Sequence, residues 1–176
     1  RLIGVTGTNG KTSITYMLKS ILEEAGYKTG VIGTIQNMIG DRVIESANTT
    51  PDAYNLNRLF RDMKNDGFDF AIMEVSSHAL EQGRVEPLCF DVAVMTNLTP
   101  EHLDFHGSME AYFDAKAKLF ERCDLAILNG DDAWAMRLRE RLRCAVRICS
   151  VRGGEADYIA EDIRDGGVEG ISYRLH

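Results

Sequence analysis

Seven residues near the start of the chain have the types and spacing of a phosphate-binding loop. Their sequence is Gly7-Thr8-Asn9-Gly10-Lys11-Thr12-Ser13. They lie between an apolar run, Leu2–Thr6, and a helical pattern, so backbone N–H groups and the positive end of a helix dipole are expected to face a bound anion. Lys11 can reach the terminal phosphates, and the Thr12 hydroxyl can ligate Mg2+. The stretch predicts a nucleoside triphosphate site.

The glycine spacing departs from the general pattern G-x-x-x-x-G-K-[ST], because Val5 stands five residues before Gly10. Glycines occupy positions 4 and 7 instead, which makes the loop a shorter variant. An ordinary strand–turn–helix is the alternative interpretation. The Gly-Lys-Thr sequence at a strand-to-helix junction favours phosphate binding over that alternative.

Polar side chains also follow other predicted strands. Glu74 ends the apolar run Phe70–Met73, and a polar stretch from Thr96 to His106 follows Val92–Met95. Ligands of open α/β sheets bind at the carboxyl ends of the strands, so these residues are expected near the phosphate loop. Glu74 is either a Mg2+ ligand of the Walker-B kind or a solvated acid. The metal role is favoured because a phosphate loop needs an acidic partner.

Three residues of the second polar stretch, His102, Asp104 and His106, are spaced by two. In an extended loop they would face one way, which suits metal binding. The spacing alone leaves other roles open, with His102 as a helix cap and the other two as hydrogen-bonding residues of a loop. Farther along, Asp131 and Asp132 precede a helical pattern and are interpreted as N-caps.

Helical and extended patterns alternate along the chain. This alternation predicts an α/β fold with a P-loop-type, mostly parallel sheet and helices on both of its faces. Strands are expected at residues 2–6, 31–35, 70–75, 92–96, 125–128 and 146–151. Helices are expected at residues 12–25, 52–66, 109–122 and 133–143. Residues 36–51 are expected to form a loop with a small hairpin around Gly40-Asp41, and residues 157–176 to start a small antiparallel subsheet.

The composition is that of an ordinary globular protein of one domain or slightly more, with 176 residues, 44% of them hydrophobic and 27% charged. A net charge of −7 argues against nucleic-acid binding, which needs clustered Lys and Arg. No apolar stretch approaches the ~20 residues of a membrane span, and no signal peptide is visible. The four cysteines form no C-x-x-C pair and are expected to be buried free thiols in the cytoplasm. Because the first strand begins at once, without an initiator Met, the chain is expected to be part of a longer protein.

Five stretches follow one another in a fixed order: the phosphate loop, Asn48-Thr49-Thr50-Pro51, Met73-Glu74-Val75-Ser76-Ser77-His78-Ala79-Leu80, Thr96-Asn97-Leu98 through His102-Leu103-Asp104-Phe105-His106-Gly107, and Ala115-Lys116. Together they resemble the central ATPase domain of the Mur ligases, the ATP-dependent amide ligases of peptidoglycan synthesis. The second and third stretches resemble the MurE type in particular. That type adds meso-diaminopimelate or L-lysine to UDP-N-acetylmuramoyl-L-alanyl-D-glutamate.

The resemblance implies a role for each matched residue. ATP is expected at residues 7–13, with one Mg2+ held by Thr12 and Glu74 and a second held by His102. Lys116 corresponds to the lysine that the family carbamylates. A neutral amine that captures CO2 becomes an anion, which supports a Mg2+ ion that a cationic lysine would repel. The UDP-muramoyl-peptide is expected to contact six residues: Asn48, Thr49, Thr50, Ser76, Gln82 and Arg84.

The implied reaction begins when the D-Glu carboxylate of the substrate attacks the γ-phosphate of ATP, which gives an acyl phosphate and ADP. Lys11 and the Mg2+ ions are expected to offset the charge that develops on the phosphate oxygens. The amino group of the incoming amino acid then attacks the acyl carbon, and phosphate leaves. Two departures from the family are mild: Pro100-Glu101 stands where it more often has a different residue followed by Asp, and Phe105 stands where it often has Tyr.

By the same resemblance, residues 1–176 form an incomplete central domain. The family's later His-Asn-x-x-Asn segment, its N-terminal uridine-binding domain and its C-terminal amino-acid-binding domain are not in this sequence. The chain alone is therefore expected to bind nucleotide poorly and to lack ligase activity, and a monomer is favoured. Two alternatives remain. One is a folylpolyglutamate synthetase-like ligase, which usually has Gly-Lys-Gly-Ser in the loop. The other is a nonenzymatic nucleotide-binding module, which needs no carbamylated lysine.

Overall fold

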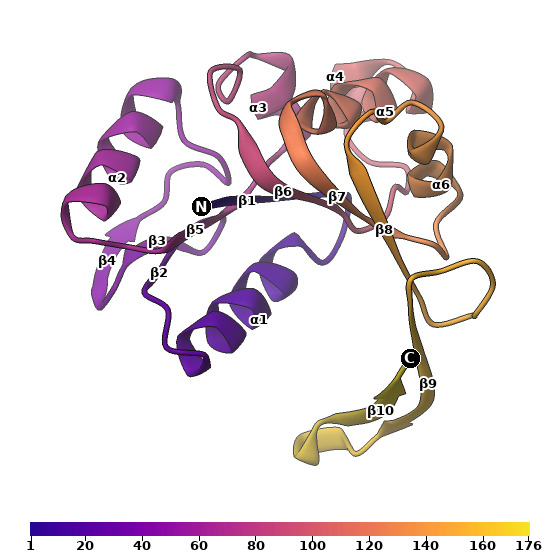
Figure 1. Ribbon diagram of the computed structural model, residues 1–176. Helices are drawn as coiled ribbons and strands as arrows, with labels where there is room; N and C mark the ends of the chain where they lie inside the picture. Colours follow the sequence, from indigo (N-terminus) through magenta and orange to yellow (C-terminus); the bar gives the residue numbers. More distant parts are fainter.

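A ten-stranded sheet organises the chain in the computed structural model, which describes residues 1–168 and 170–176 (Figure 1). The strands are β1 (Leu2–Thr6), β2 (Thr29–Ile32), β3 (Gln36–Ile39), β4 (Arg42–Glu45), β5 (Phe70–Glu74), β6 (Phe90–Met95), β7 (Cys123–Asn129), β8 (Ala145–Ser150), β9 (Tyr158–Asp165) and β10 (Ile171–Leu175). Their order across the sheet is β10-β9-β8-β7-β6-β1-β5-β2-β3-β4. The strands from β2 to β9 in this order run parallel, and antiparallel hairpins close both edges. The mostly parallel α/β fold expected from the sequence is confirmed.

Helices cover both faces of the sheet, but unequally. They are α1 (Lys11–Glu24), α2 (Ala53–Asn65), α3 (Ser77–Glu81), α4 (Leu103–His106), α5 (Met109–Ala117) and α6 (Ala133–Arg139), with the 3-10 helix η1 (Lys118–Arg122) after α5. Figure 1 shows α1 on one face of the sheet and α2 to α6 on the other. Both faces of the central strands are therefore buried, which explains their continuous apolar runs.

The central strand β1 connects the two layers. On one face, Ile3 and Val5 pack against α1 through Leu18. On the other face, the backbone at Gly4 approaches the Phe90 ring so closely that an added Cβ would lie 2.7 Å from it. This close packing fixes the strand whose carboxyl end leads into the phosphate loop.

Some element boundaries differ from those expected. β2 covers Thr29–Ile32 rather than 31–35, because the chain leaves the sheet at Gly33 to pass the Glu74 side chain. The short helix α3 was not expected from the sequence. The single helix expected over 109–122 tightens into η1 after Ala117. The helix expected over 133–143 ends at Arg139, where i→i+3 turns replace the α-helical hydrogen bonds.

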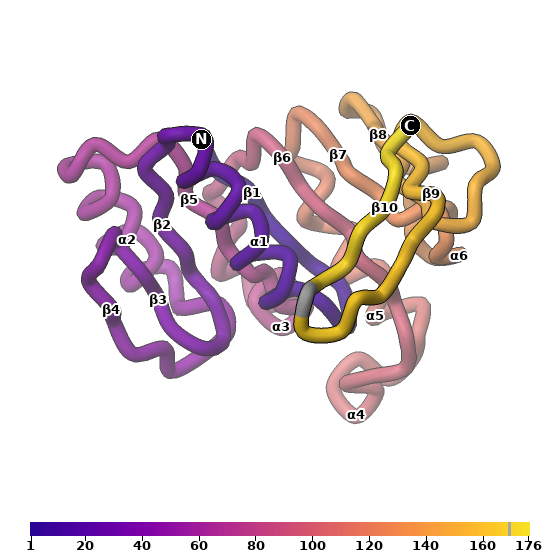
Figure 2. Tube along the Cα trace, turned by 90° about the horizontal axis from the view of Figure 1, so that it is seen from below, coloured from indigo at the N-terminus to yellow at the C-terminus, as the bar shows by residue number. Residues whose placement is uncertain are grey.

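Both hairpins expected from the sequence are present. β3 and β4 pair around Gly40, whose φ of +60° suits the tight turn. β9 and β10 pair at the end of the chain. Figures 1 and 2 show this terminal hairpin turning away from the sheet on the face that carries α1.

The four cysteines are free thiols, as expected, but the expectation that they are buried is wrong. Cys89 and Cys149 are exposed, and Cys123 and Cys144 are partly exposed. Each lies at a strand end or on the outer part of the sheet, where an apolar neighbour in sequence does not guarantee cover. In residues 1–168 and 170–176, none of the helices has the length and apolar character needed to cross a bilayer.

Candidate active site

The phosphate loop connects β1 to α1 and depends on two glycines. Gly7 has φ +139°, and an added Cβ would lie 1.9 Å from the Thr96 Oγ1 atom of the neighbouring strand end. Gly10 has φ +85° at the N-cap of α1, with open space around it. The loop is tied to the next strand end by the Thr8 N–H, which donates to the Asn97 carbonyl at 2.9 Å. The backbone at the start of α1 therefore faces open space, as an anion site requires.

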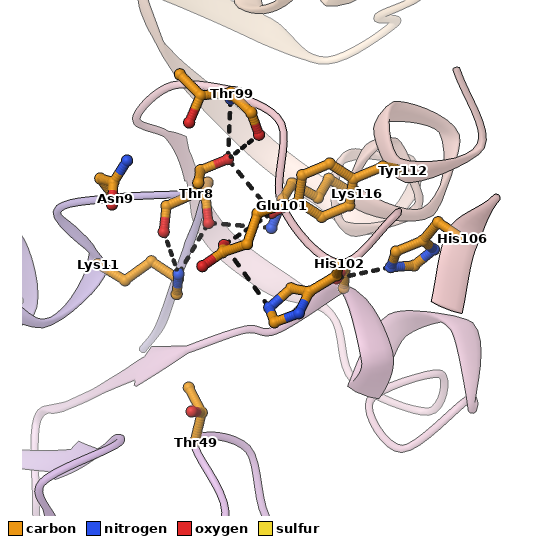
Figure 3. Close-up of polar contacts among 12 residues, drawn as sticks. Thr8, Asn9, Lys11, Thr49, Thr99, Glu101, His102, His106, Tyr112 and Lys116 are labelled. Carbon is orange, nitrogen blue, oxygen red and sulfur yellow. Dashed lines mark hydrogen bonds and ion pairs between the residues drawn. The ribbon is translucent and has the colours of Figure 1, made fainter. Parts of the chain in front are cut away.

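Lys11 lies folded over the loop (Figure 3). Its Nζ donates to the carbonyl oxygens of Gly7 at 2.9 Å and Thr8 at 2.8 Å. Burial lowers the pKa of Lys11, and the charges of Glu101 and Glu74 oppose that change. An anion bound at the α1 N-terminus would offer this ammonium stronger partners than two neutral carbonyls.

Glu74 ends β5 beside the loop and is 1% exposed. Its carboxylate accepts the Thr12 hydroxyl at 3.0 and 2.9 Å. It also accepts the Thr34 N–H at 3.0 Å and the Thr34 hydroxyl at 2.9 Å. Gly33 permits this approach, because a Cβ there would lie 2.4 Å from Glu74 Oε1. A carboxylate and two hydroxyls are the hard oxygen donors that Mg2+ prefers, so this group fits the ion expected here.

Lys116 lies in the interior behind the loop, only 2% exposed. Its Nζ donates to the Gly7 carbonyl at 3.0 Å and lies 4.6 Å from the centre of the Tyr112 ring. Burial and the charge of Lys11 lower the pKa of Lys116 to about 7, against a smaller opposing effect of Glu101. A large fraction of this amine is therefore neutral at physiological pH.

Tyr112 and Glu101 join this interior to the loop. The Tyr112 hydroxyl lies 3.3 Å from Thr8 Oγ1 and donates to Glu101 at 3.4 Å. Thr8 Oγ1 also contacts the Thr99 backbone, with N–H and carbonyl at 3.0 and 3.1 Å (Figure 3). Burial raises the pKa of Tyr112, so its hydroxyl keeps its proton. Tyr112 precedes Lys116 by one helical turn of α5, so both side chains face the loop.

The residues expected to form an extended metal-binding loop are arranged differently. Leu103–His106 is the helical turn α4, so His102, Asp104 and His106 do not face one way. His102 has φ +54° and lies 3.6 Å from Glu101, at the margin of the cleft, and its side chain caps nothing. His106 Nε2 instead contacts the Ser77 hydroxyl at 3.0 Å.

Among the described residues, no group of three or more His, Cys, Asp or Glu side chains could hold a metal ion. Thr12 and Glu74 are in direct contact, and His102 lines the same cleft, whereas Lys116 lies behind the loop. Protein side chains alone therefore provide an incomplete Mg2+ shell, which phosphate oxygens and water commonly complete.

The residues expected to bind a larger substrate form a hydrogen-bonded network beside Glu74. The buried Thr50 hydroxyl donates to the Glu74 carbonyl at 2.9 Å and accepts the Ser76 N–H at 3.0 Å. Arg84 donates to the Thr50 carbonyl at 2.9 Å and to the Gln82 side chain at 2.9 and 2.5 Å. Thr50 is fully buried, so its hydroxyl serves this network rather than the open cleft.

Two further expected residues lie on the same side. The Thr34 hydroxyl gives its proton to Glu74 and accepts the Thr49 hydroxyl at 3.1 Å, which places Thr49 one contact away from Glu74. Asn48 is exposed, and its carbonyl accepts the Ser46 hydroxyl at 2.8 Å. A cleft of about 310 Å3 runs between this network and the loop. It is lined by Thr8, Asn9, Gly10, Lys11, Thr12, Ser13, Thr34, Thr49, Glu74, Ser76, Glu101 and His102.

The two acids expected to cap a helix have separate roles. Asp132 is the N-cap of α6, since its side chain accepts the Ala135 N–H at 2.8 Å. It also accepts the Leu98 N–H at 3.0 Å. Asp131 is not a cap, because its carboxylate is used by the Ser150 hydroxyl at 2.6 Å and the Val151 N–H at 2.8 Å. The acids thus fix the chain on each side of β7.

Residues 5–172 match the protein family described as the Mur ligase middle domain. The chain belongs to the Mur ligase family. It is 46% identical over 175 residues to the UDP-N-acetylmuramoyl-L-alanyl-D-glutamate--2,6-diaminopimelate ligase of Caldanaerobacter subterraneus subsp. tengcongensis, a match that covers 99% of this chain. It is 52% identical over 138 residues to the ligase 1 of the same name from Clostridium acetobutylicum, covering 78% of this chain. The resemblance to the MurE type is confirmed.

This Mur ligase chain spans about a third of its relatives, because the two matches cover 36% and 29% of their lengths. A solved structure of a UDP-N-acetylmuramoyl-L-alanyl-D-glutamate--2,6-diaminopimelate ligase matches with a TM-score of 0.88 at 35% identity, covering 99% of this chain and 37% of that one. E. coli FolC in complex with ADP matches with a TM-score of 0.67 at 18% identity, covering 97% of this chain and 47% of that one. The second likeness shows a shared fold.

Sequence reasoning missed two side chains in this Mur ligase site. Thr34 was placed inside the expected strand 31–35, although it follows β2 and donates to Glu74. Tyr112 was not singled out, although its fully buried side chain lies against both Lys116 and the loop. The spacing of Tyr112 and Lys116, four residues apart, was the one available signal that both side chains share a face of α5.

Proposed function

We propose that this chain is the ATP-binding domain of an ATP-dependent ligase of peptidoglycan precursor synthesis. The full-length protein adds meso-diaminopimelate to UDP-N-acetylmuramoyl-L-alanyl-D-glutamate. The observation that carries the proposal is the arrangement around the loop, with Lys11 and the Thr12–Glu74 pair on its open side and the buried amine of Lys116 behind it. The names of relatives that are 46% and 52% identical support the substrate class.

In this proposal, the loop binds the triphosphate of ATP. The backbone N–H groups at the start of α1 face the β- and γ-phosphates, and Lys11 moves from the Gly7 and Thr8 carbonyls to the phosphate oxygens. Its ammonium then offsets the negative charge that develops when the substrate carboxylate attacks the γ-phosphate. The products of this step are an acyl phosphate and ADP. The amino group of the second substrate attacks the acyl carbon, and phosphate leaves.

Thr12 and Glu74 hold one Mg2+, and His102 with a carbamylated Lys116 holds a second. When bound, Mg2+ supplies positive charge to the phosphate oxygens. The hydrogen bonds from Thr34 keep the Glu74 carboxylate at the cleft, and Gly33 leaves the space for it.

The pKa of Lys116 supports carbamylation. A lysine with the ordinary pKa of 10.5 is neutral in roughly one molecule out of 3000 at pH 7, whereas a pKa of about 7 leaves about half of the amine neutral. Only the neutral amine attacks CO2, forming an N–C bond and releasing a proton. The product is an anion behind the phosphate loop, close to Lys11.

The UDP-muramoyl-dipeptide binds on the Thr49 side of the cleft. Thr49, Ser76 and Arg84 are the side chains that we assign to it, with Asn48 and Gln82 at its margin. Thr50 does not face the cleft, and its buried hydroxyl holds Ser76 in place by hydrogen-bonding the Glu74 carbonyl and the Ser76 N–H. A cytoplasmic, monomeric protein goes with this proposal, and the four free thiols fit a reducing compartment.

The decisive assay uses the full-length protein with ATP, Mg2+ and UDP-N-acetylmuramoyl-L-alanyl-D-glutamate. We expect phosphate release and an amide product that depend on meso-diaminopimelate, with L-lysine a poorer substrate. A folate substrate with glutamate should give no product. Ligation of glutamate to folate, or ATP binding without any amide product, would favour one of the alternative functions.

The Lys116→Ala variant tests the carbamate. We expect ligation to be lost and to return in part with a small added carboxylate. 13C-labelled bicarbonate should give a carbamate signal in the protein that keeps Lys116 and none in the variant. Lys118→Ala is the matched control, since Lys118 is an exposed neighbour paired with Glu81. Full ligation by Lys116→Ala without an added carboxylate would contradict the proposed role.

A further inference from the structure

Two cysteines lie side by side at the amino ends of their strands, opposite the carboxyl ends that carry the phosphate loop. Cys123 begins β7, and Cys144 immediately precedes the neighbouring parallel strand β8. Their Sγ atoms are 3.5 Å apart. The loop follows the carboxyl end of β1, whereas both cysteines lie where their strands start. The pair is therefore separate from the site described above.

The two thiols are accessible to a reagent. Both are partly exposed, and both line a cavity of about 620 Å3. Arg141 and Arg143 line the same cavity, together with one acid, Glu121. Asp114 lies outside the lining and binds Arg141 at 2.6 Å. Because Asp114 pairs with Arg141 and the charge of Asp124 reaches Cys123, the charges around the two thiols nearly balance and set no preference for an anionic or a cationic reagent.

We propose that Cys123 and Cys144 are a redox modification site that a small disulfide, such as glutathione disulfide, converts to an intramolecular disulfide. One thiolate attacks the reagent, forms a mixed disulfide and expels one glutathione thiolate. The second thiolate attacks the protein sulfur of that mixed disulfide and expels the second glutathione. In total, two protein thiols lose two electrons and two protons, and one glutathione disulfide becomes two glutathione molecules.

The geometry needs only a small change for this reaction. The two sulfur atoms must approach from 3.5 Å to about 2.05 Å. Burial, with a further effect of Cys144 and Asp124, raises the pKa of the Cys123 thiol. Cys123 is thus a poor first nucleophile, so we assign Cys144 to the mixed disulfide and Cys123 to the second step.

The cross-link would close residues 124–143 into a ring. This ring contains α6 and Asp132, whose carboxylate holds the Leu98 N–H at the phosphate-loop edge of the sheet. A disulfide here is expected to raise the unfolding temperature of the domain, because it restricts the unfolded chain between β7 and β8. Oxidation of the two cysteines would thereby restrict the segment whose Asp132 holds Leu98 beside the phosphate loop.

The test treats the full-length protein, reduced and then freed of reductant, with glutathione disulfide. Peptide mapping should find a Cys123–Cys144 linked peptide, lighter than the two free peptides by two hydrogen atoms and released by dithiothreitol. Linking should also occur with the cationic disulfide cystamine, because the charges around the two thiols nearly balance. The Cys123→Ser variant should retain glutathione on Cys144, and Cys89→Ser with Cys149→Ser should link as the unchanged protein does.

Two results would overturn the proposal. In the first, Cys123 and Cys144 stay reduced in the folded protein without substitutions, while the same protein unfolded in urea forms the link in the same reagent. The other is linking that occurs equally fast in the unfolded sample, since this would show that the native arrangement contributes nothing. Neither comparison depends on whether the serine variants fold.

Discussion

Replacing Lys116 with Met should stabilise the domain while removing the amine that we propose to react with CO2. Lys116 is 2% exposed, and its pKa falls from 10.5 to about 7, mainly through burial. A pKa difference of one corresponds to about 1.4 kcal/mol. The ammonium therefore costs the folded state about 5 kcal/mol below pH 7, where both states of the chain carry the proton.

Met removes this cost, but the contacts that Lys116 makes are lost with it and offset part of the gain in stability. Met cannot donate to the Gly7 carbonyl or place a cation near the Tyr112 ring, which together are worth ~2 kcal/mol. The Gly7 oxygen is not left without a partner, since Lys11 still donates to it at 2.9 Å. We expect Lys116→Met to raise the free energy of unfolding by about 2 to 4 kcal/mol at about pH 6.

The dependence on pH is the sharper test. Between about 7 and 10.5 the folded chain has lost the Lys116 proton and the unfolded chain still binds it, so stability rises with pH in the unchanged protein. Lys116→Met lacks this increase. Its advantage should therefore be full below pH 7, shrink by about 1.4 kcal/mol per pH unit above 7 and disappear near about pH 9, above which the unchanged protein is the more stable.

Urea unfolding of both chains in CO2-free buffer, at about pH 6 and about pH 9, measures this difference. Lys118→Met is the control, because Lys118 is exposed and paired with Glu81, and it should change stability by less than about 1 kcal/mol at either pH. An advantage of Lys116→Met that is absent, or that grows with pH, would refute the reasoning.

Four further substitutions test other parts of the site. Gly7→Ala should destabilise the fold by about 1–3 kcal/mol in thermal unfolding, because its Cβ would collide with Thr96 Oγ1; Gly10→Ala, with open space around it, should cost only about 1 kcal/mol. Glu74→Gln should leave the fold intact but weaken the Mg2+ dependence of ATP binding in calorimetry at least tenfold, and an unchanged Mg2+ response would contradict the metal role. Asp132→Ala should lower the free energy of unfolding by about 1–3 kcal/mol, since it removes both the cap of α6 and the partner of the Leu98 N–H, and a change below about 0.5 kcal/mol would show that water replaces both bonds.

Local sequence was enough to predict the phosphate loop and its neighbours at the sheet edge. A strand, a glycine turn and a helix start lie within residues 2–13, so the loop can be recognised from local sequence even though residues 96–99 contact it in the fold. The position of Glu74 followed from the rule that carboxyl ends of parallel strands converge. The alternation of helices and strands predicted the fold class for the same reason, since a parallel neighbour needs a crossover helix.

The remaining features depend on packing that periodicity does not report. The helical pattern predicts that Lys116 is an ordinary exposed polar residue. It is buried because α5 packs beneath the loop. The expected strand 31–35 concealed Thr34, because the chain leaves the sheet early to pass the Glu74 carboxylate. Cys123 and Cys144 looked like interior thiols, but a strand start and a turn leave them partly exposed. For Lys116 and Thr34, the deciding neighbour lies far away in sequence.

The Gly7 carbonyl accepts hydrogen bonds from two lysines, Lys11 on the nucleotide side and Lys116 behind it. A change of charge on either amine therefore alters what holds the other. In the function that we propose, Lys116 becomes an anionic carbamate, and Lys11 then loses a repelling neighbour and one competitor for its acceptor. Thermodynamic reciprocity then requires that CO2 and phosphate change each other's affinity by the same factor. Dissolved CO2 would thus act on this domain as a co-ligand of the nucleotide, because both lysines hydrogen-bond the same Gly7 carbonyl oxygen.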